Sequence, residues 1–99
     1  MQNRYDKSTE DLCKALLSLK TKEECLAFLE DICTIKEIQD ISQRLEVACM
    51  LSQGISYTTI CKETGASTAT ISRVKKCLVW GSGGYRTALE RAKSEEAKA

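Results

Sequence analysis

The chain has no proline and no histidine among its 99 residues, and aromatic residues make up only 5%. Without proline, helices can run uninterrupted, and the scarcity of aromatic residues disfavours β-strands. Histidine is the side chain that most often serves as a general base near neutral pH, so its absence argues against acid–base catalysis. There is also no phosphate-binding glycine loop and no nucleophile beside a base. We therefore expect neither an enzyme nor catalytic residues.

Long hydrophobic runs are absent as well. The longest uncharged stretch, residues 47–61, has fifteen residues and includes serine, threonine, glutamine and glycine. A membrane-spanning helix needs ~20 mainly apolar residues. The charged N-terminus has no apolar run behind it, so no secretory signal is expected either. These absences predict a cytoplasmic protein with no membrane partner.

Six cysteines are present, but their spacing fits neither a disulfide framework nor a metal site. They are Cys13, Cys25, Cys33, Cys49, Cys61 and Cys77. No pair has the C-x₂-C or C-x₄-C spacing of zinc and iron–sulfur sites, and an even count suggests disulfides only in a secreted protein. We expect small, reduced, buried thiols on helix faces and no bound metal. A redox-sensing thiol is the alternative.

The length suits a single domain over residues 1–99, with 42% hydrophobic and 29% charged residues. The net charge of +1 hides an uneven distribution. Residues 1–40 hold six Lys/Arg against nine Asp/Glu, a net charge of −3, whereas residues 41–80 hold five against two, a net charge of +3. The acidic front and basic middle predict that an anionic partner meets the middle of the chain.

Capping residues followed by apolar side chains at helical spacing predict about six helices. The predicted helices run from about 9 to 20, from the cap at Thr21 through Ile32, from the cap at Thr34 to a stop at residues 52–54, from 57 to about 63 and from 68 to about 79, with a final segment from about residue 85. Thr21 and Thr34 each begin a capping box, and Gly54 supplies a left-handed residue after the third helix. The apolar face of the second helix is expected to be buried. With no predicted strand, the fold class is all-α.

Residues 56–79 predict a central helix-turn-helix. Gly65 tolerates the positive φ that the turn needs, and the small Cys61 sits where the two helices touch. The positions expected to face the core are Ile60, Ala66, Ile71 and Val74. Residues 56–80 hold four basic side chains against one acidic, which suits contact with DNA phosphates. The motif predicts double-stranded DNA as the partner.

The exposed side chains of this hairpin are the candidates for DNA contact. Small and hydroxyl-bearing residues early in the second helix can approach base edges, and lysines can contact phosphates. The base-contact candidates are Ser67, Thr68, Ala69 and Ser72, and the phosphate-contact candidates are Lys62, Lys75 and Lys76. The alternative is that Thr68 and Ser72 lie on the helix surface and have no role in binding.

The string Gly65-Ala-Ser-Thr-Ala-Thr-Ile-Ser-Arg73 resembles the recognition-helix signature of Trp repressor proteins. Together with QRLEV at residues 43–47 and GGY at 83–85, it resembles the YerC/YecD branch of that family over about residues 30–90. The resemblance implies an intertwined homodimer in which the N-terminal helices of both subunits build a shared core. Its two recognition helices would enter successive major grooves of a palindromic operator.

The resemblance also implies an effector site. In Trp repressors the indole of the ligand lies between two arginines from different subunits, matched here by Arg44 and Arg73, and Thr70 matches a pocket threonine. Val74 replaces the family's glycine, which puts a branched side chain in the path of a flat ring, and Cys77 replaces a pocket serine. We therefore do not expect tryptophan as the ligand. The alternatives are that the ligand is another small amino acid or that the protein has no effector at all.

Together, these observations predict a sequence-specific DNA-binding transcriptional regulator, expected to be a repressor and a homodimer. A helical protein–protein adaptor without DNA binding is the alternative, because the front of the chain is acidic. For Arg44 the alternative is a salt bridge with Glu46 or Asp40, and Arg73 could serve as a phosphate contact. Trp80 and Tyr85 are expected to pack the last helix onto the core.

Overall fold

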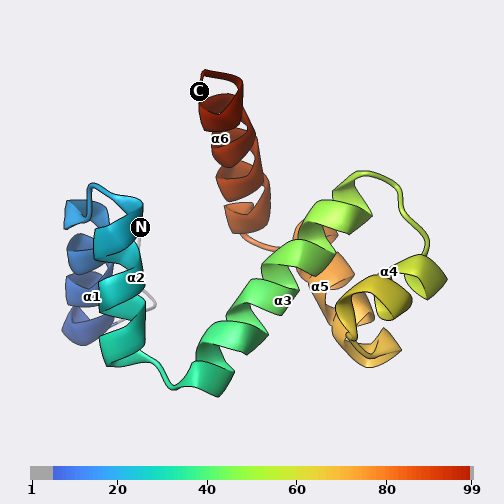
Figure 1. Ribbon diagram of the computed structural model, residues 1–99, viewed down its shortest axis with the longest axis horizontal. Helices are drawn as coiled ribbons and strands as arrows, with labels where there is room; N and C mark the ends of the chain where they lie inside the picture. Colours follow the sequence, from blue (N-terminus) through green and yellow to red (C-terminus); the bar gives the residue numbers. More distant parts are fainter. Residues whose placement is uncertain (1–5, 99) are drawn as a thin grey trace. The chain divides into compact units, whose positions relative to one another are not determined.

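The computed structural model describes residues 6–98, with side chains up to residue 95, and contains six helices (Figure 1). They are α1 Lys7–Ser18, α2 Lys22–Ile32, α3 Ile35–Ser52, α4 Tyr57–Thr64, α5 Thr68–Trp80 and α6 Gly84–Lys98. No strand occurs in this part of the chain, which confirms the all-α prediction. None of the helices within it is long and apolar enough to cross a membrane.

Side-chain caps fix where α2 and α3 begin. The hydroxyl of Thr21 accepts a hydrogen bond from the Glu24 amide at 3.1 Å, and that of Thr34 accepts one from the Glu37 amide at 3.1 Å. The carboxylate of Glu24 accepts from the Lys20 amide at 2.8 Å, and that of Glu37 accepts from the Thr34 amide at 2.8 Å. At α3 the two bonds are reciprocal and satisfy amides at the helix start, so the predicted capping box of Thr34 is confirmed. At α2 the predicted cap by Thr21 is confirmed, but the Glu24 carboxylate bonds the Lys20 amide before the cap and not the amide of Thr21.

Helix α1 begins at Lys7 and not near residue 9 as predicted. The Asp6 carboxylate accepts hydrogen bonds from the Thr9 amide at 3.0 Å and from the Thr9 hydroxyl at 3.1 Å. The hydrogen bond from the Thr9 amide lowers the pKa of Asp6 from its ordinary value, and the hydrogen bond from the Thr9 hydroxyl lowers it further. Aspartate is among the best N-cap residues, and its charge suits the positive end of a helix. The helix therefore starts after Asp6 and not after the hydroxyl residues Ser8 and Thr9.

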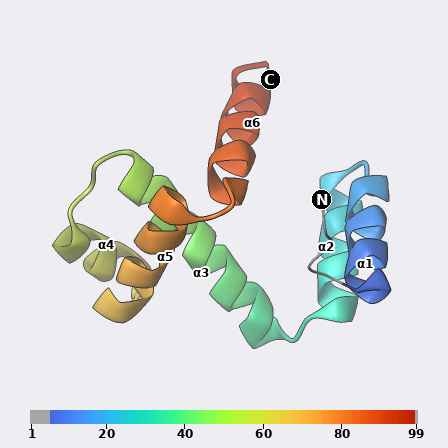
Figure 2. The same cartoon turned by 180° about the vertical axis from the view of Figure 1, so that it is seen from behind.

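The chain divides into an N-terminal unit that ends at Ile38 and a C-terminal unit that begins at Gln39. In the N-terminal unit α1 and α2 run side by side (Figures 1 and 2). Neither helix contains a buried residue, and Leu26 and Ile32 of α2 are 47% and 54% exposed. The prediction of a buried face on α2 is therefore wrong for this chain. Phe28 and Leu29 of the same helix are half-buried.

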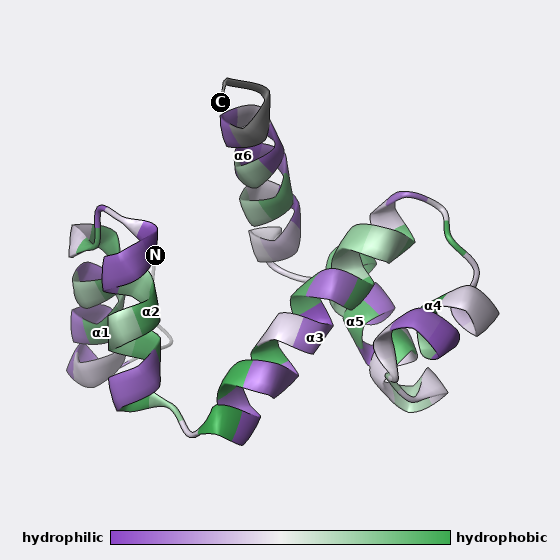
Figure 3. Cartoon of the chain, viewed as in Figure 1, coloured by the Kyte–Doolittle hydropathy of each residue, from purple (hydrophilic) through white to green (hydrophobic). Residues whose placement is uncertain are grey.

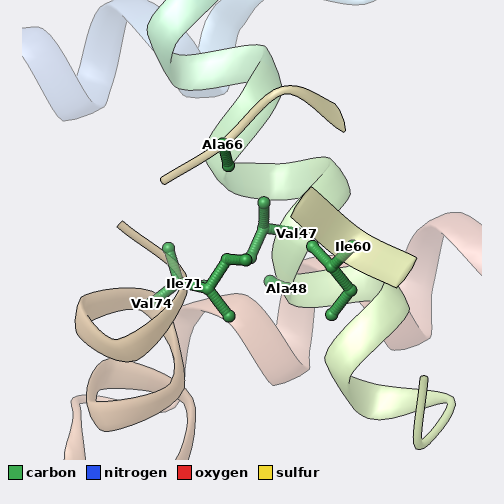
Figure 4. Close-up of a cluster of buried hydrophobic side chains, with 6 residues drawn as sticks. All are labelled: Val47, Ala48, Ile60, Ala66, Ile71 and Val74. Carbon is green, nitrogen blue, oxygen red and sulfur yellow. The ribbon is translucent and has the colours of Figure 1, made fainter. Parts of the chain in front are cut away.

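The core lies in the C-terminal unit, where α3, α4 and α5 meet (Figure 4). It consists of six apolar side chains that are at most 5% exposed: Val47, Ala48, Ile60, Ala66, Ile71 and Val74. Tyr85 and Leu89 of α6 pack against it, as expected for Tyr85. The four core positions predicted for the hairpin are thus confirmed. Val47 is an addition that the helical spacing of α3 did not single out.

Trp80 does not pack onto the core as predicted. It is the last residue of α5 and is 83% exposed. It follows the buried Ile71 by nine positions, or about two and a half helical turns, so it lies on the opposite side of the helix. Tyr85 therefore packs α6 against the core without a contribution from this indole.

The cysteines are less buried than predicted. All six are free, Cys13, Cys25 and Cys77 are exposed, and the other three are partly buried. Two of the exposed thiols lie on α1 and α2, neither of which contains a buried residue, so the prediction of buried thiols is wrong. Among the residues described, no group of three or more His, Cys, Asp and Glu side chains could hold a metal ion.

Candidate nucleic-acid interface

Helices α4 and α5 form the predicted helix-turn-helix, and Gly65 makes the turn between them. Its φ is 75°, and its amide donates to the Cys61 carbonyl at 3.0 Å, which ends α4. This left-handed conformation strains residues with a side chain, and glycine adopts it freely. The structure confirms the role predicted for Gly65.

Polar side chains from two helices hold the turn. The Thr64 hydroxyl donates to the Ile60 carbonyl at 2.7 Å and accepts from the Ala66 amide at 3.1 Å. From α3, Gln43 Nε2 donates to the Thr64 carbonyl at 3.1 Å. These roles of Gln43 and Thr64 are not predicted from the sequence, because a polar side chain on a helix gives no pattern that marks a tertiary hydrogen bond. Together these bonds orient α5 relative to α3 and α4.

Ser67 caps α5, the second helix of the hairpin. Its hydroxyl accepts from the Thr70 amide at 3.1 Å and donates to the Thr70 hydroxyl at 3.1 Å. Ser67, a base-contact candidate, is thus the N-cap of α5, and both hydroxyls are occupied in bonds within the helix terminus. The cap sets the direction in which the first turn of α5 presents its side chains.

The remaining base-contact candidates lie on the solvent side of α5. Thr68, Ala69 and Ser72 are all exposed, whereas Ile71 and Val74 of the same helix are buried. Thr68 and Ser72 are four residues apart, which puts them on one side of the helix. The structure thus brings these three small side chains together on a surface that base edges can reach.

The three phosphate-contact candidates are also exposed, with Lys62 on α4 and Lys75 and Lys76 on α5. Lys75 has a partner that the sequence does not reveal: its Nζ lies over the ring of Tyr57, 5.6 Å from the ring centroid. Such a cation–π contact contributes about 0.5–1 kcal/mol at an exposed site. Lys75 therefore links the start of α4 to the middle of α5 while its charge stays at the surface.

A groove of about 570 Å³ opens between α3, the second half of α5 and the start of α6. Its walls include Arg44 and Leu45 of α3, Cys77 of α5 and Tyr85 of α6. Of the four predicted effector residues, Arg44 and Cys77 line this groove. Thr70 and Arg73 do not line it, and Val74 belongs to the buried core.

Comparison with known protein families agrees with this helical arrangement. A sequence profile described as "Trp repressor protein" matches residues 7–93. This chain belongs to the Trp repressor family. The resemblance over the recognition helix is thereby confirmed, and it extends to α1 and α2. The Trp repressor fold is that of a regulator and not of an enzyme.

Relatives within the Trp repressor family are close in sequence and in fold. The uncharacterized protein YerC of Bacillus subtilis (strain 168) is 56% identical over 90 residues, covering 91% of this chain and 86% of YerC. A crystal structure of a "putative Trp repressor" from Staphylococcus aureus matches with a TM-score of 0.85 and 49% identity, covering 90% of this chain and 89% of that one. A TrpR-like protein from Eubacterium eligens ATCC 27750 gives the same TM-score and identity, with coverage of 89% and 91%.

The Ser67 cap gives a test of how α5 is held. Ser67→Ala should lower the free energy of unfolding by about 1 kcal/mol, because it leaves an amide of the first turn without its acceptor. Ser67→Asp should retain wild-type stability, because its carboxylate accepts the same bond and suits the helix dipole. Urea denaturation of both variants measures the difference. Ser82→Ala, at an exposed position outside the helices, is the control. An equal urea midpoint for Ser67→Ala and the wild type would contradict the role of the cap.

Proposed function

We propose that this protein is a transcriptional regulator that binds double-stranded DNA through the α4–α5 hairpin, with α5 as the recognition helix, and that it acts as a repressor. The observation that carries the proposal is the exposed face of Thr68, Ala69 and Ser72 on a helix whose opposite side is locked into the core. Small polar side chains there suit base edges in a major groove. Acting on chromosomal DNA, such a regulator would work in the cytoplasm.

The charge distribution supports DNA over a protein–protein adaptor. The hairpin region, residues 56–80, has four basic side chains and one acidic, whereas residues 1–40 carry a net charge of −3. Phosphates attract the first region and repel the second, so the charges orient the hairpin toward DNA. In this arrangement lysines supply affinity that is independent of sequence, and α5 supplies the discrimination between bases.

Two groups of substitutions should affect DNA binding differently. Lys62→Ala and Lys76→Ala should weaken binding about equally on all sequences and reduce the salt slope of log K by about 0.9 for each phosphate that is no longer neutralised. Thr68→Ala and Ser72→Ala should leave the slope unchanged and relax base preference at particular positions. Fluorescence anisotropy with labelled duplexes at several salt concentrations distinguishes these outcomes. Lys14→Ala, on α1 in the acidic front of the chain, is the matched control. Unchanged affinity in all four variants would contradict DNA binding by the hairpin.

We also propose that the regulator is a homodimer, on the basis of the uncovered apolar surface of its N-terminal unit. Figure 3 shows hydrophobic segments along α1, α2 and the start of α3. Large apolar side chains there are between 40% and 85% exposed: Leu12, Leu16, Leu17, Leu26, Ile32 and Ile35. Monomeric proteins rarely leave such a surface in water, and a second copy offers the same surface in return. A dimer would also present two recognition helices to a palindrome.

Leu17→Glu tests the dimer. Leu17 is 85% exposed in the single chain, so in a monomer the change should alter stability by no more than about 0.5 kcal/mol. In a dimer that covers this face it would bury an unpaired charge, and the protein should dissociate. Sedimentation velocity over a range of concentrations measures the mass. Ser8→Glu, which makes the same charge change at the start of α1, is the control and should remain a dimer. A Leu17→Glu variant that dimerises as the wild type does would contradict the proposed interface.

The groove beside α5 is the proposed site for a small amino-acid effector. A half-buried guanidinium on Arg44 can bind a carboxylate through two hydrogen bonds, and the apolar walls, which include Ile41 and Leu45, can hold an apolar side chain. The groove within one chain offers one arginine and the thiol of Cys77, since Arg73 lies outside it. This lining differs from the pair of arginines and the serine expected around tryptophan, so an amino acid other than tryptophan is proposed.

A thermal-shift screen of the twenty amino acids tests this site. An effector present at about 100 times its Kd should stabilise the protein by about 2.7 kcal/mol through linkage, which raises Tm. Arg44→Ala should abolish the shift, whereas Arg91→Ala, an exposed arginine on α6, should retain it. If no amino acid changes Tm, the groove has no amino-acid ligand, and regulation must come from elsewhere.

A further inference from the structure

The C-terminal half of α5 carries an exposed patch that combines a tryptophan with two lysines. A shallow hollow of about 310 Å³ is lined by Ser72, Lys75, Lys76, Val79 and Trp80, with no acidic side chain among them. Trp80 is 83% exposed and is the only tryptophan in the chain. An exposed indole beside two ammonium groups contributes nothing to the core, so its position needs another explanation.

The patch continues the surface that is proposed to read DNA. Ser72, Lys76 and Trp80 follow one another at intervals of four residues, which aligns them along one side of the helix. At 1.5 Å per residue, Ser72 and Trp80 are about 12 Å apart along the helix axis. A major groove is about 12 Å wide. When Ser72 is at a base edge, Trp80 can therefore reach a sugar–phosphate wall of the groove.

The helix end holds Trp80 in place on this surface. The amide of Gly81 donates to the Cys77 carbonyl at 2.8 Å and ends α5 directly after Trp80. A Cβ at Gly81 would collide with that carbonyl, so the tight turn there depends on glycine. The chain then leaves toward α6, which packs on the core through Tyr85 and Leu89. Within the described residues Trp80 is left open to solvent at a fixed position.

We propose that Trp80 binds the DNA backbone, with its ring against a deoxyribose and its indole N–H donating to a phosphate oxygen. This inference rests on the proposed function and extends the interface from base edges to the strand beside them. The indole nitrogen is a donor only, and a phosphate oxygen is an acceptor. Lys75 and Lys76 supply the positive charge that draws the phosphates to this patch. The charge of the hollow, and its continuity with Ser72, identify DNA as the occupant.

The emission of Trp80 tests the inference directly, because no other tryptophan contributes to it. The full-length protein is titrated at low salt with a mixed-sequence DNA duplex of about 30 base pairs, close to three helical turns. Anisotropy of a dye on the duplex reports binding, and quenching by acrylamide, which is neutral and not repelled by DNA, reports access to the indole. We expect strong quenching in the free protein and a several-fold lower quenching constant in the complex.

Substitutions separate the indole from the lysines. Trp80→Ala should weaken DNA binding about tenfold, as expected for loss of one hydrogen bond to a charged group. The salt slope should stay unchanged, because a neutral indole releases no counterion. Trp80→Phe, which keeps a flat ring without the N–H, should fall between Ala and the wild type, and Lys76→Ala should reduce the slope by about 0.9 if its ammonium neutralises one phosphate. Unchanged thermal unfolding of the Trp80 variants verifies that the fold is intact.

The possible results can be told apart. If the duplex binds while quenching of Trp80 and the affinity of Trp80→Ala stay the same, the inference is overturned and the proposed function stands. If no duplex binds at low salt, the proposed function fails and the inference fails with it. If Trp80 is already protected without DNA, and more so at higher protein concentration, a second copy covers the patch and the inference is overturned.

Discussion

The packing of α4 and α5 against α3 is the constraint on which the other features of the C-terminal unit depend. Ala48 and Ala66 are small enough to let the backbones approach, and Ile60 and Ile71 fill the space between the helices. Burying each large aliphatic side chain contributes about 1.5–3 kcal/mol. Such contacts are available only if the chain reverses tightly at Gly65, so the positive φ of that residue and the composition of the core depend on each other.

The same packing creates the surface proposed to bind DNA. Because one side of α5 is held in the core by Ile71 and Val74, the other side is fixed in solvent. Because a rigid helix is already ordered, it loses less conformational entropy on binding, which favours affinity. The N-terminal unit has no comparable core, since α1 and α2 have no buried residue. The proposed dimer would cover the apolar side chains of those helices and stabilise them.

Local features of the fold can be predicted from the sequence because they depend on neighbouring residues. The helix caps at Thr21 and Thr34 and the left-handed turn at Gly65 are decided by chemistry within a few positions of the chain. The predicted start of α1 is wrong because Asp6 competes with the nearby hydroxyls for the role of N-cap, and the carboxylate prevails. The identity of the matched family follows from the residues around Gly65 for the same local reason.

Tertiary features are harder to predict. The hydrogen bond from Gln43 to the Thr64 carbonyl joins residues 21 positions apart, and no sequence pattern marks it. The size and apolar character of Trp80 favour a place in the core, but its angular position on α5 turns it to solvent. Burial of the thiols and of the α2 face is set by tertiary packing, which residue type and helical spacing do not determine. Which of the effector candidates meet in one groove depends likewise on how α3, α5 and α6 pack.

Selection of bound fragments from a random-sequence duplex library by the purified protein tests sequence-specific DNA binding most directly. A homodimer with α5 as its recognition helix predicts enrichment of a palindrome whose half-sites are about one helical turn apart. The enriched sequence should lose its advantage when Thr68 or Ser72 is replaced by alanine. Recovery of fragments with no sequence in common at low salt, with and without amino acids present, would contradict a sequence-specific regulator.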